Sequence, residues 1–173
     1  MICLFVVDPG SHTGVAQGRF WEEGSIAERI ASRSHFKTTT LEGPDLKQVR
    51  ELWWMWREFM MECRRAGLPY EIIFEDFILT RLKSSKREGL SPVRITAMFL
   101  GYREGLADGY ESAGFGPAFV QKVIFQQPSD AFSFATDDRL REWGLWLPGK
   151  DHEHEREATS HLCLRLNKRS HLR

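Results

Sequence analysis

The stretch ICLFVVDPGSHTGVA, residues 2–16, decides the expected fold. Residues 2–7 are apolar at every position, which is typical of a central strand buried on both faces. The strand then reaches a carboxylate, Asp8, and the Pro-Gly pair that follows stops it and turns the chain. Apolar residues resume at Val15, so we expect a hairpin. Asp8 therefore projects from the end of a rigid element, either as a functional carboxylate or as the cap of a turn.

The composition is that of one intracellular domain. The chain has 173 residues, of which 42% are hydrophobic and 12% aromatic, enough for a single domain over residues 1–173 with its own core. Lysine plus arginine equals aspartate plus glutamate at 24 each, so a nucleic-acid partner would depend on local basic patches. Three widely separated cysteines favour buried thiols over a disulfide or zinc site. With no basic leader and no long apolar run, we expect a soluble cytoplasmic protein without a membrane span.

Apolar periodicity and turn residues predict an alternation of strands and helices. We expect strands at 15–20 and 26–36, although residues 26–30 fit the start of a short helix equally well. A long amphipathic helix should begin near Pro44 and end near Gly67, followed by a strand and a second long helix. The remaining expected elements are that strand at 70–79, the helix at 93–112, a strand at 119–125, a loop and cap at 126–130, a short helix at 137–143 and a helix from about 151.

A second acid ends the apolar run YEIIFEDFIL, residues 70–79. Glu75 follows three apolar residues, and Asp76 comes directly after it. Because successive side chains of a strand face opposite ways, only one of the two can share a site with Asp8.

A basic segment follows at RLKSSKREG, residues 81–89. Its cations are Arg81, Lys83, Lys86 and Arg87. Such a run is either solvated surface or, because it follows an acid at a strand end, a contact for DNA phosphates. Lys122, in a later predicted strand, is a further candidate for such a contact.

Four of the six histidines lie beyond residue 150, three of them in the stretch DHEHEREATSH, residues 151–161. On a helix, His154, Glu157 and His161 share one face, with Asp151 at its edge. Glu153 and Glu155 should point away to either side. The pattern suits metal ligands, but it also suits an ordinary helix start, where acids are favoured by the helix dipole.

Taken together, VVDPGSHTGVA, IIFEDF and HEREATSH resemble the RNase H-like nucleases, most closely the RuvC-type Holliday junction resolvases and especially their phage-encoded members. The resemblance spans nearly the whole chain in the expected order. It implies an α/β fold with a five-stranded mixed sheet flanked by helices. It also implies that Asp8, Glu75, His154 and Glu157 are the catalytic and metal-binding residues, with Glu157 standing where the family usually has aspartate.

The same resemblance implies hydrolysis of DNA phosphodiesters with two Mg²⁺ or Mn²⁺ ions in each active site. It further implies a homodimer that acts on branched DNA such as a Holliday junction, in a bacterial or phage-infected cell. The loop at 81–87, Lys122 and the tail residues Lys168 and Arg169 would hold phosphates.

Three other functions remain open on the sequence. The first is an RNase H-like nuclease for flap DNA or RNA-DNA hybrids. The second is a sugar kinase or actin-like ATPase, which also begins with an acid and a glycine after its first strand but needs two lobes. The third is a DNA-binding module of the same fold without catalysis.

Overall fold

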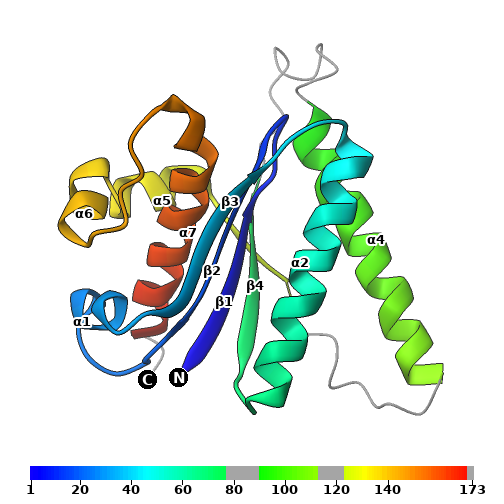
Figure 1. Cartoon of the computed structure of the whole chain (residues 1–173), viewed down its shortest axis with the longest axis horizontal. Helices are drawn as coiled ribbons and strands as arrows, with labels where there is room; N and C mark the ends of the chain where they lie inside the picture. Colours follow the sequence, from blue (N-terminus) through cyan, green and yellow to red (C-terminus); the bar gives the residue numbers. More distant parts are fainter. Residues whose placement is uncertain (77–89, 113–122, 171–173) are drawn as a thin grey trace.

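The computed structural model describes residues 1–76, 90–112 and 123–170 and has a five-stranded mixed sheet as its middle layer (Figure 1). The strands lie in the order β3-β2-β1-β4-β5. β2 is antiparallel to both β1 and β3, whereas β4 is parallel to both β1 and β5. The bounds are Ile2–Asp8 for β1, Thr13–Phe20 for β2, Ser34–Leu41 for β3, Tyr70–Glu75 for β4 and Val123–Gln126 for β5. The predicted sheet is confirmed.

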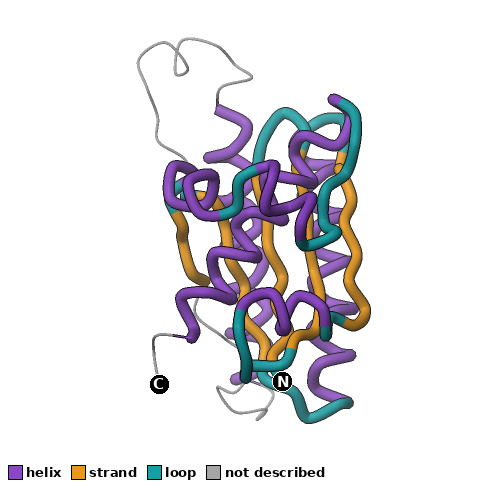
Figure 2. The backbone as a smooth tube through the Cα atoms, turned by 90° about the vertical axis from the view of Figure 1, so that its left-hand side faces the viewer, coloured by secondary structure: helices purple, strands orange, loops and turns teal. Residues whose placement is uncertain are grey.

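Two helical layers enclose this sheet, as Figures 1 and 2 show from two sides. One face is covered by α2 (Asp45–Arg65) and α4 (Ser91–Ser112). The other is crossed by α7 (Glu153–Ser170), which packs against the sheet and is preceded by a short 3₁₀ turn, η3 (Lys150–His152). Around α7 lie α1 (Ile26–Ala31), α5 (Pro128–Phe134) and α6 (Asp137–Glu142). Within the described residues, no helix has the length and apolar character of a membrane span.

The central strand β1 supplies side chains to both cores. Phe5 and Val7 belong to the cluster under α2 and α4, whereas Leu4 and Val6 belong to the cluster under α7. Every residue of β1 is buried, which explains the unbroken apolar sequence of residues 2–7. By the same alternation, the next side chain of β1, that of Asp8, faces α7.

The strand predicted at 26–36 is wrong, and the short-helix alternative is confirmed in its place. Ser25 and Glu28 form a reciprocal capping box, in which the Ser25 side chain accepts from the Glu28 backbone and Glu28 accepts from the Ser25 backbone. This box satisfies N–H groups that a helix start leaves unpaired, so the segment begins α1. The third strand starts only at Ser34 and continues to Leu41, beyond the predicted range.

The loop predicted at 126–130 is also wrong. Gln126 still belongs to β5, and Pro128 begins α5, a helix that the sequence did not reveal. Proline at the first helical position has no N–H to leave unsatisfied, so the strand passes into a helix almost directly. Strand β4 ends at Glu75. Residues 77–79 and 119–122 of the predicted strands lie outside the described residues.

The three cysteines are buried free thiols, as predicted. Cys3 and Cys63 lie in the core under α2 and α4. Cys163 lies in the core under α7, and burial raises the pKa of its thiol. The two helical layers therefore each contain native thiols that are shielded from solvent.

Candidate metal centre

Asp8 lies at the end of β1 and is only 4% exposed. It pairs with Gly14 across the hairpin, so the two residues face the same side of the sheet. That side is covered by the first turns of α7. The backbone thus directs the Asp8 carboxylate toward α7, as a buried group held by the central strand.

His154 and Glu157 on the first turns of α7 complete a cluster with Asp8. The Nδ1 atom of His154 lies 3.0 Å from Oδ2 of Asp8 and 3.2 Å from Oε2 of Glu157. Ligand atoms of the three side chains all lie within 4.8 Å of one another. The structure therefore brings together three of the four predicted metal ligands.

Gly14 allows this close approach of α7 to β2. A Cβ atom built on Gly14 would lie 2.0 Å from the backbone oxygen of His154 and 2.4 Å from its carbonyl carbon. No other residue type fits without moving the helix, because both clashing atoms are backbone. The position of His154 thus depends on a glycine in the opening motif.

Glu75, the fourth predicted ligand, ends the strand next to Asp8 and has a different partner. Val7 pairs with Phe74 in the parallel β1–β4 ladder, so the two acids follow at the same edge of the sheet. Oε2 of Glu75 lies 3.2 Å from Nε2 of His161, and Glu75 is not part of the three-residue cluster.

Asp76 is directed away from this cluster, as expected for the residue that follows Glu75 directly in the chain. Its side chain accepts a hydrogen bond from the Gln127 amide, and its backbone N–H donates to the Gln126 carbonyl. Of the two adjacent acids, Glu75 is therefore the one that shares a face with Asp8, as expected if only one of them can belong to the site.

The electrostatics of the cluster show compensation between one cation and several acids. Burial raises the pKa of Asp8 well above its usual value; a hydrogen bond from His154 opposes that rise, and the charges of Glu75 and Glu157 add to it. Hydrogen bonds to Asp8 and Glu157 raise the pKa of His154 to about 10. For Glu157, burial disfavours ionisation, but hydrogen bonds from His154 and Asp8 outweigh it and lower the pKa. A protonated His154 thus partly neutralises the buried carboxyl group of Asp8 and the partly buried one of Glu157.

The donor set fits a divalent cation. It offers carboxylate oxygens, which Mg²⁺ and Mn²⁺ prefer, and one imidazole nitrogen, which Mn²⁺ accepts more readily than Mg²⁺. A cation would also supply the positive charge that the acids now draw from His154, and its binding requires that proton to leave. Asp8, His154 and Glu157 are the residues placed to hold it, with Glu75 beside them.

Other predicted site residues lie elsewhere. Asp151 is exposed in η3 and outside the cluster.

The two predicted phosphate contacts on α7 are paired with acids. Lys168 pairs with Asp130, and Arg169 pairs with Glu22 and Glu71. Both cations lie near the far end of α7, about 18 Å along the helix from Glu157. These two cations are therefore engaged by acids away from the site, which counts against the phosphate contacts expected of them. Arg81, Lys83, Lys86, Arg87 and Lys122 lie outside the described residues.

Sequence reasoning underestimated Glu155. It points away from Asp8, as expected, but it is buried and accepts hydrogen bonds from the hydroxyls of Thr38 and Thr40 on β3. These bonds fasten the start of α7 to the edge strand. No local pattern marks this anchor, because its threonine partners lie more than a hundred positions away in the sequence.

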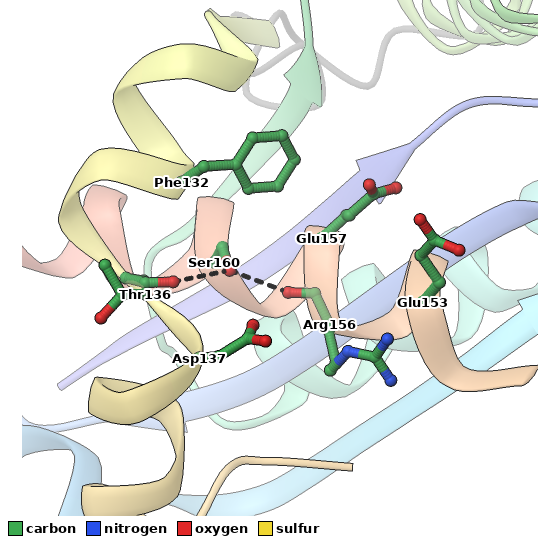
Figure 3. A pocket seen from close by; sticks show the side chains of 8 residues that line it. Phe132, Thr136, Asp137, Glu153, Arg156, Glu157 and Ser160 are labelled. Atoms are coloured by element: carbon green, nitrogen blue, oxygen red, sulfur yellow. Dashed lines mark hydrogen bonds between the residues drawn. The ribbon is translucent and has the colours of Figure 1, made fainter. Parts of the chain in front are cut away.

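A recess of about 390 Å³ lies beside the cluster, between α5 and α7 (Figure 3). Glu157 is shared by the cluster and the recess, and Phe132, 42% exposed, forms part of the wall on the α5 side. The other lining residues are Ala135, Thr136, Asp137, Glu153, Arg156 and Ser160. The candidate metal centre is therefore open to a ligand from this side.

The sheet order, the two helical layers and the position of the acids define an RNase H-like fold, as predicted. The chain resembles two solved structures of Thermus thermophilus RuvC. One is RuvC alone, with 12% identity, a TM-score of 0.55 and coverage of 96% of this chain and 95% of that chain. The other is T. thermophilus RuvC with a Holliday junction substrate, with 13% identity, a TM-score of 0.54 and coverage of 98% and 96%. No protein-family model and no curated protein sequence matches the chain.

Proposed function

We propose that this protein is a metal-dependent endonuclease that cleaves Holliday junctions or related branched DNA. The observation that carries the proposal is the convergence of Asp8, His154 and Glu157 at the end of the central strand, with Glu75 on the adjacent strand. An RNase H-like fold with acids at these strand ends and on this helix is suited to phosphodiester hydrolysis. The likeness to T. thermophilus RuvC, solved with a Holliday junction, supports the choice of substrate.

In this proposal Asp8, Glu75, His154 and Glu157 hold two Mg²⁺ or Mn²⁺ ions. Bound ions of this kind activate the attacking water and stabilise the leaving 3′ oxygen. The protein supplies fixed positions: Asp8 from the central strand, and His154 and Glu157 from a helix packed against Gly14. His154 gives up the proton that it shares with the two acids, so both carboxylates become available as ligands.

Binding of the DNA backbone is assigned to the basic segment at 81–87 and to Lys122. The chain has no net charge, so the attraction of phosphates must come from such local groups. A junction has two strands to cut at symmetric positions, and one chain offers one cluster among its described residues. We therefore expect a homodimer to be the working assembly, which analytical ultracentrifugation can test.

The decisive experiment is cleavage of a four-way junction with and without a divalent cation. We expect cleavage only with Mg²⁺ or Mn²⁺, and we expect Asp8→Asn to abolish it while junction binding is retained. Glu75→Gln should behave in the same way. Asp76→Asn is the matched control. Asp76 bonds to Gln127 and not to the cluster, so its substitution should lower the cleavage rate little. Near-normal nicking by Asp8→Asn would show that the proposed function is wrong.

A further inference from the structure

We propose that His161, with Gln126, is a positioning residue that holds the Glu75 carboxylate in the orientation in which it binds a cation. This inference rests on the proposed function, because it takes Glu75 as a ligand. His161 is 0% exposed and lies one helical turn beyond Glu157 on α7. The metal-binding face of the helix therefore continues into a buried hydrogen-bond network.

The geometry connects two neighbouring strand ends through one imidazole ring. Nε2 of His161 lies 3.2 Å from Oε2 of Glu75, and Nδ1 lies 3.2 Å from Oε1 of Gln126. Glu75 and Gln126 are paired residues of β4 and β5, so they face α7 side by side. The ring of Phe132 packs edge-on against the imidazole, with the ring centroids 6.4 Å apart. The orientation of His161 is thus fixed from three sides.

Both imidazole nitrogens are engaged, which favours a supporting role for His161 over direct metal binding. A cation at either nitrogen would have to displace Glu75 or Gln126 inside a fully buried network. The ring instead has one nitrogen directed at each of two neighbouring side chains. This arrangement is the one by which residues behind a metal site orient the ligands themselves.

Gln126 is needed to fix which nitrogen of the His161 ring carries the proton. An ionised Glu75 can only accept, so His161 must present an N–H at Nε2. In a neutral ring Nδ1 then accepts, and it needs a donor. The structure places the Oε1 atom of Gln126 toward Nδ1, and among the described residues the Nε2 atom of the same amide is buried without a partner. A half-turn of the amide exchanges these two atoms and presents an N–H to Nδ1. In that orientation Gln126 selects the ring form that donates to Glu75.

The consequence for Glu75 is a fixed carboxylate. Its side chain has three rotatable bonds and is only 13% exposed, and the bond to His161 holds Oε2 while Oε1 has no partner among the described residues. A ligand whose second oxygen is held loses less conformational freedom when a cation binds. Removing His161 should therefore weaken cation binding, and only by way of its effect on Glu75.

The test measures Mn²⁺ binding to the DNA-free protein by the electron paramagnetic resonance signal of free Mn²⁺. We expect His161→Leu to weaken binding about tenfold or more. His161→Gln, whose amide N–H reaches a similar distance from the backbone, should recover most of the affinity. Gln126→Leu should weaken binding in the same direction and by less. The control is Thr159→Val, a buried position of α7 bonded to the Glu155 carbonyl, which should bind Mn²⁺ like the wild type.

A double-mutant cycle separates positioning from general damage to the fold. In a Glu75→Gln background, His161→Leu should cost no further affinity, because its effect passes through that carboxylate. An equal loss of Mn²⁺ affinity in both backgrounds would overturn the inference. So would a His161→Leu variant that binds Mn²⁺ like the wild type when Asp8→Asn does not bind it. Failure of the wild type to bind Mn²⁺ would overturn the proposed function and the inference together. Gln126→Leu gives an independent reading if His161→Leu does not fold.

Discussion

Substituting Gly14 with alanine should displace the turn of α7 that carries the candidate ligands His154 and Glu157, while leaving every predicted ligand in the sequence. The added Cβ would lie 2.0 Å from the His154 backbone oxygen, whereas ordinary contact begins near 3.4 Å. The start of the helix would have to withdraw by about 1.4 Å, because neither clashing group is a flexible side chain. His154 and Glu157 would move away from Asp8, which stays with the central strand.

The expected size of the effect follows from that displacement. A catalytic group misplaced by about 1 Å can lower the rate roughly 100-fold, so we expect at least this loss in junction cleavage. Overpacking of a buried position costs about 1–3 kcal/mol of unfolding free energy, which should leave the variant folded. Binding of Mn²⁺ should weaken as well, because three ligands no longer meet at one point.

The assays are junction cleavage, Mn²⁺ binding and urea denaturation on the same preparation. Gly18→Ala is the matched control, since it makes the same change on the same strand but its Cβ would meet the side chains of Phe20 and Phe36. It should lose some stability and keep its Mn²⁺ affinity. A folded Gly14→Ala protein that cleaves within twofold of the wild type would refute the argument that β2 and α7 are in this close contact.

Three other outcomes are expected. The affinity for Mn²⁺ should rise from pH 6 to pH 9, because the pKa of His154 is about 10 and the cation must displace the proton of that imidazole. Calorimetry in two buffers measures the released proton, and an affinity that does not change with pH would contradict this expectation. Cleavage should be faster in Mn²⁺ than in Mg²⁺, and His154→Asp should narrow the difference by giving an all-oxygen site; an unchanged ratio of the two rates would remove His154 from the ligands. Gly105→Ala in α4, whose Cβ would meet no described heavy atom within 4 Å, should raise the unfolding free energy by about 0.5–1 kcal/mol in urea titrations, and a loss would indicate an unseen neighbour.

The central strands and their acids could be predicted because burial on both faces leaves a direct trace in the sequence. Residues 2–7 are apolar at every position since successive side chains enter different cores, and Asp8 is the first polar side chain after them. The sequence limited the second acid to Glu75 or Asp76. Choosing Glu75 required knowing that Ile73, which points to the same side of the strand, enters the core under α7.

The edge strand and the network behind Glu75 could not be predicted, for different physical reasons. Strand β3 is half exposed and rich in threonine, so the more apolar segment before it attracted the strand prediction. That error also hid the partners of Glu155. Gln126 had no distinguishing pattern, because a single amide at a strand end acquires its role only when a residue 35 positions later packs onto it.

The distribution of the three cysteines makes the two helical layers separately observable. Because Cys3 and Cys63 are buried in the core under α2 and α4, we expect them to react when that layer lifts from the sheet, and we expect Cys163, buried under α7, to react when α7 does. Pulsed alkylation followed by mass spectrometry would therefore report which layer opens first, without engineered probes. Since α7 carries His154 and Glu157 and the other layer carries no residue of the cluster, the same labelling would distinguish local opening of the candidate metal centre from opening of the opposite layer.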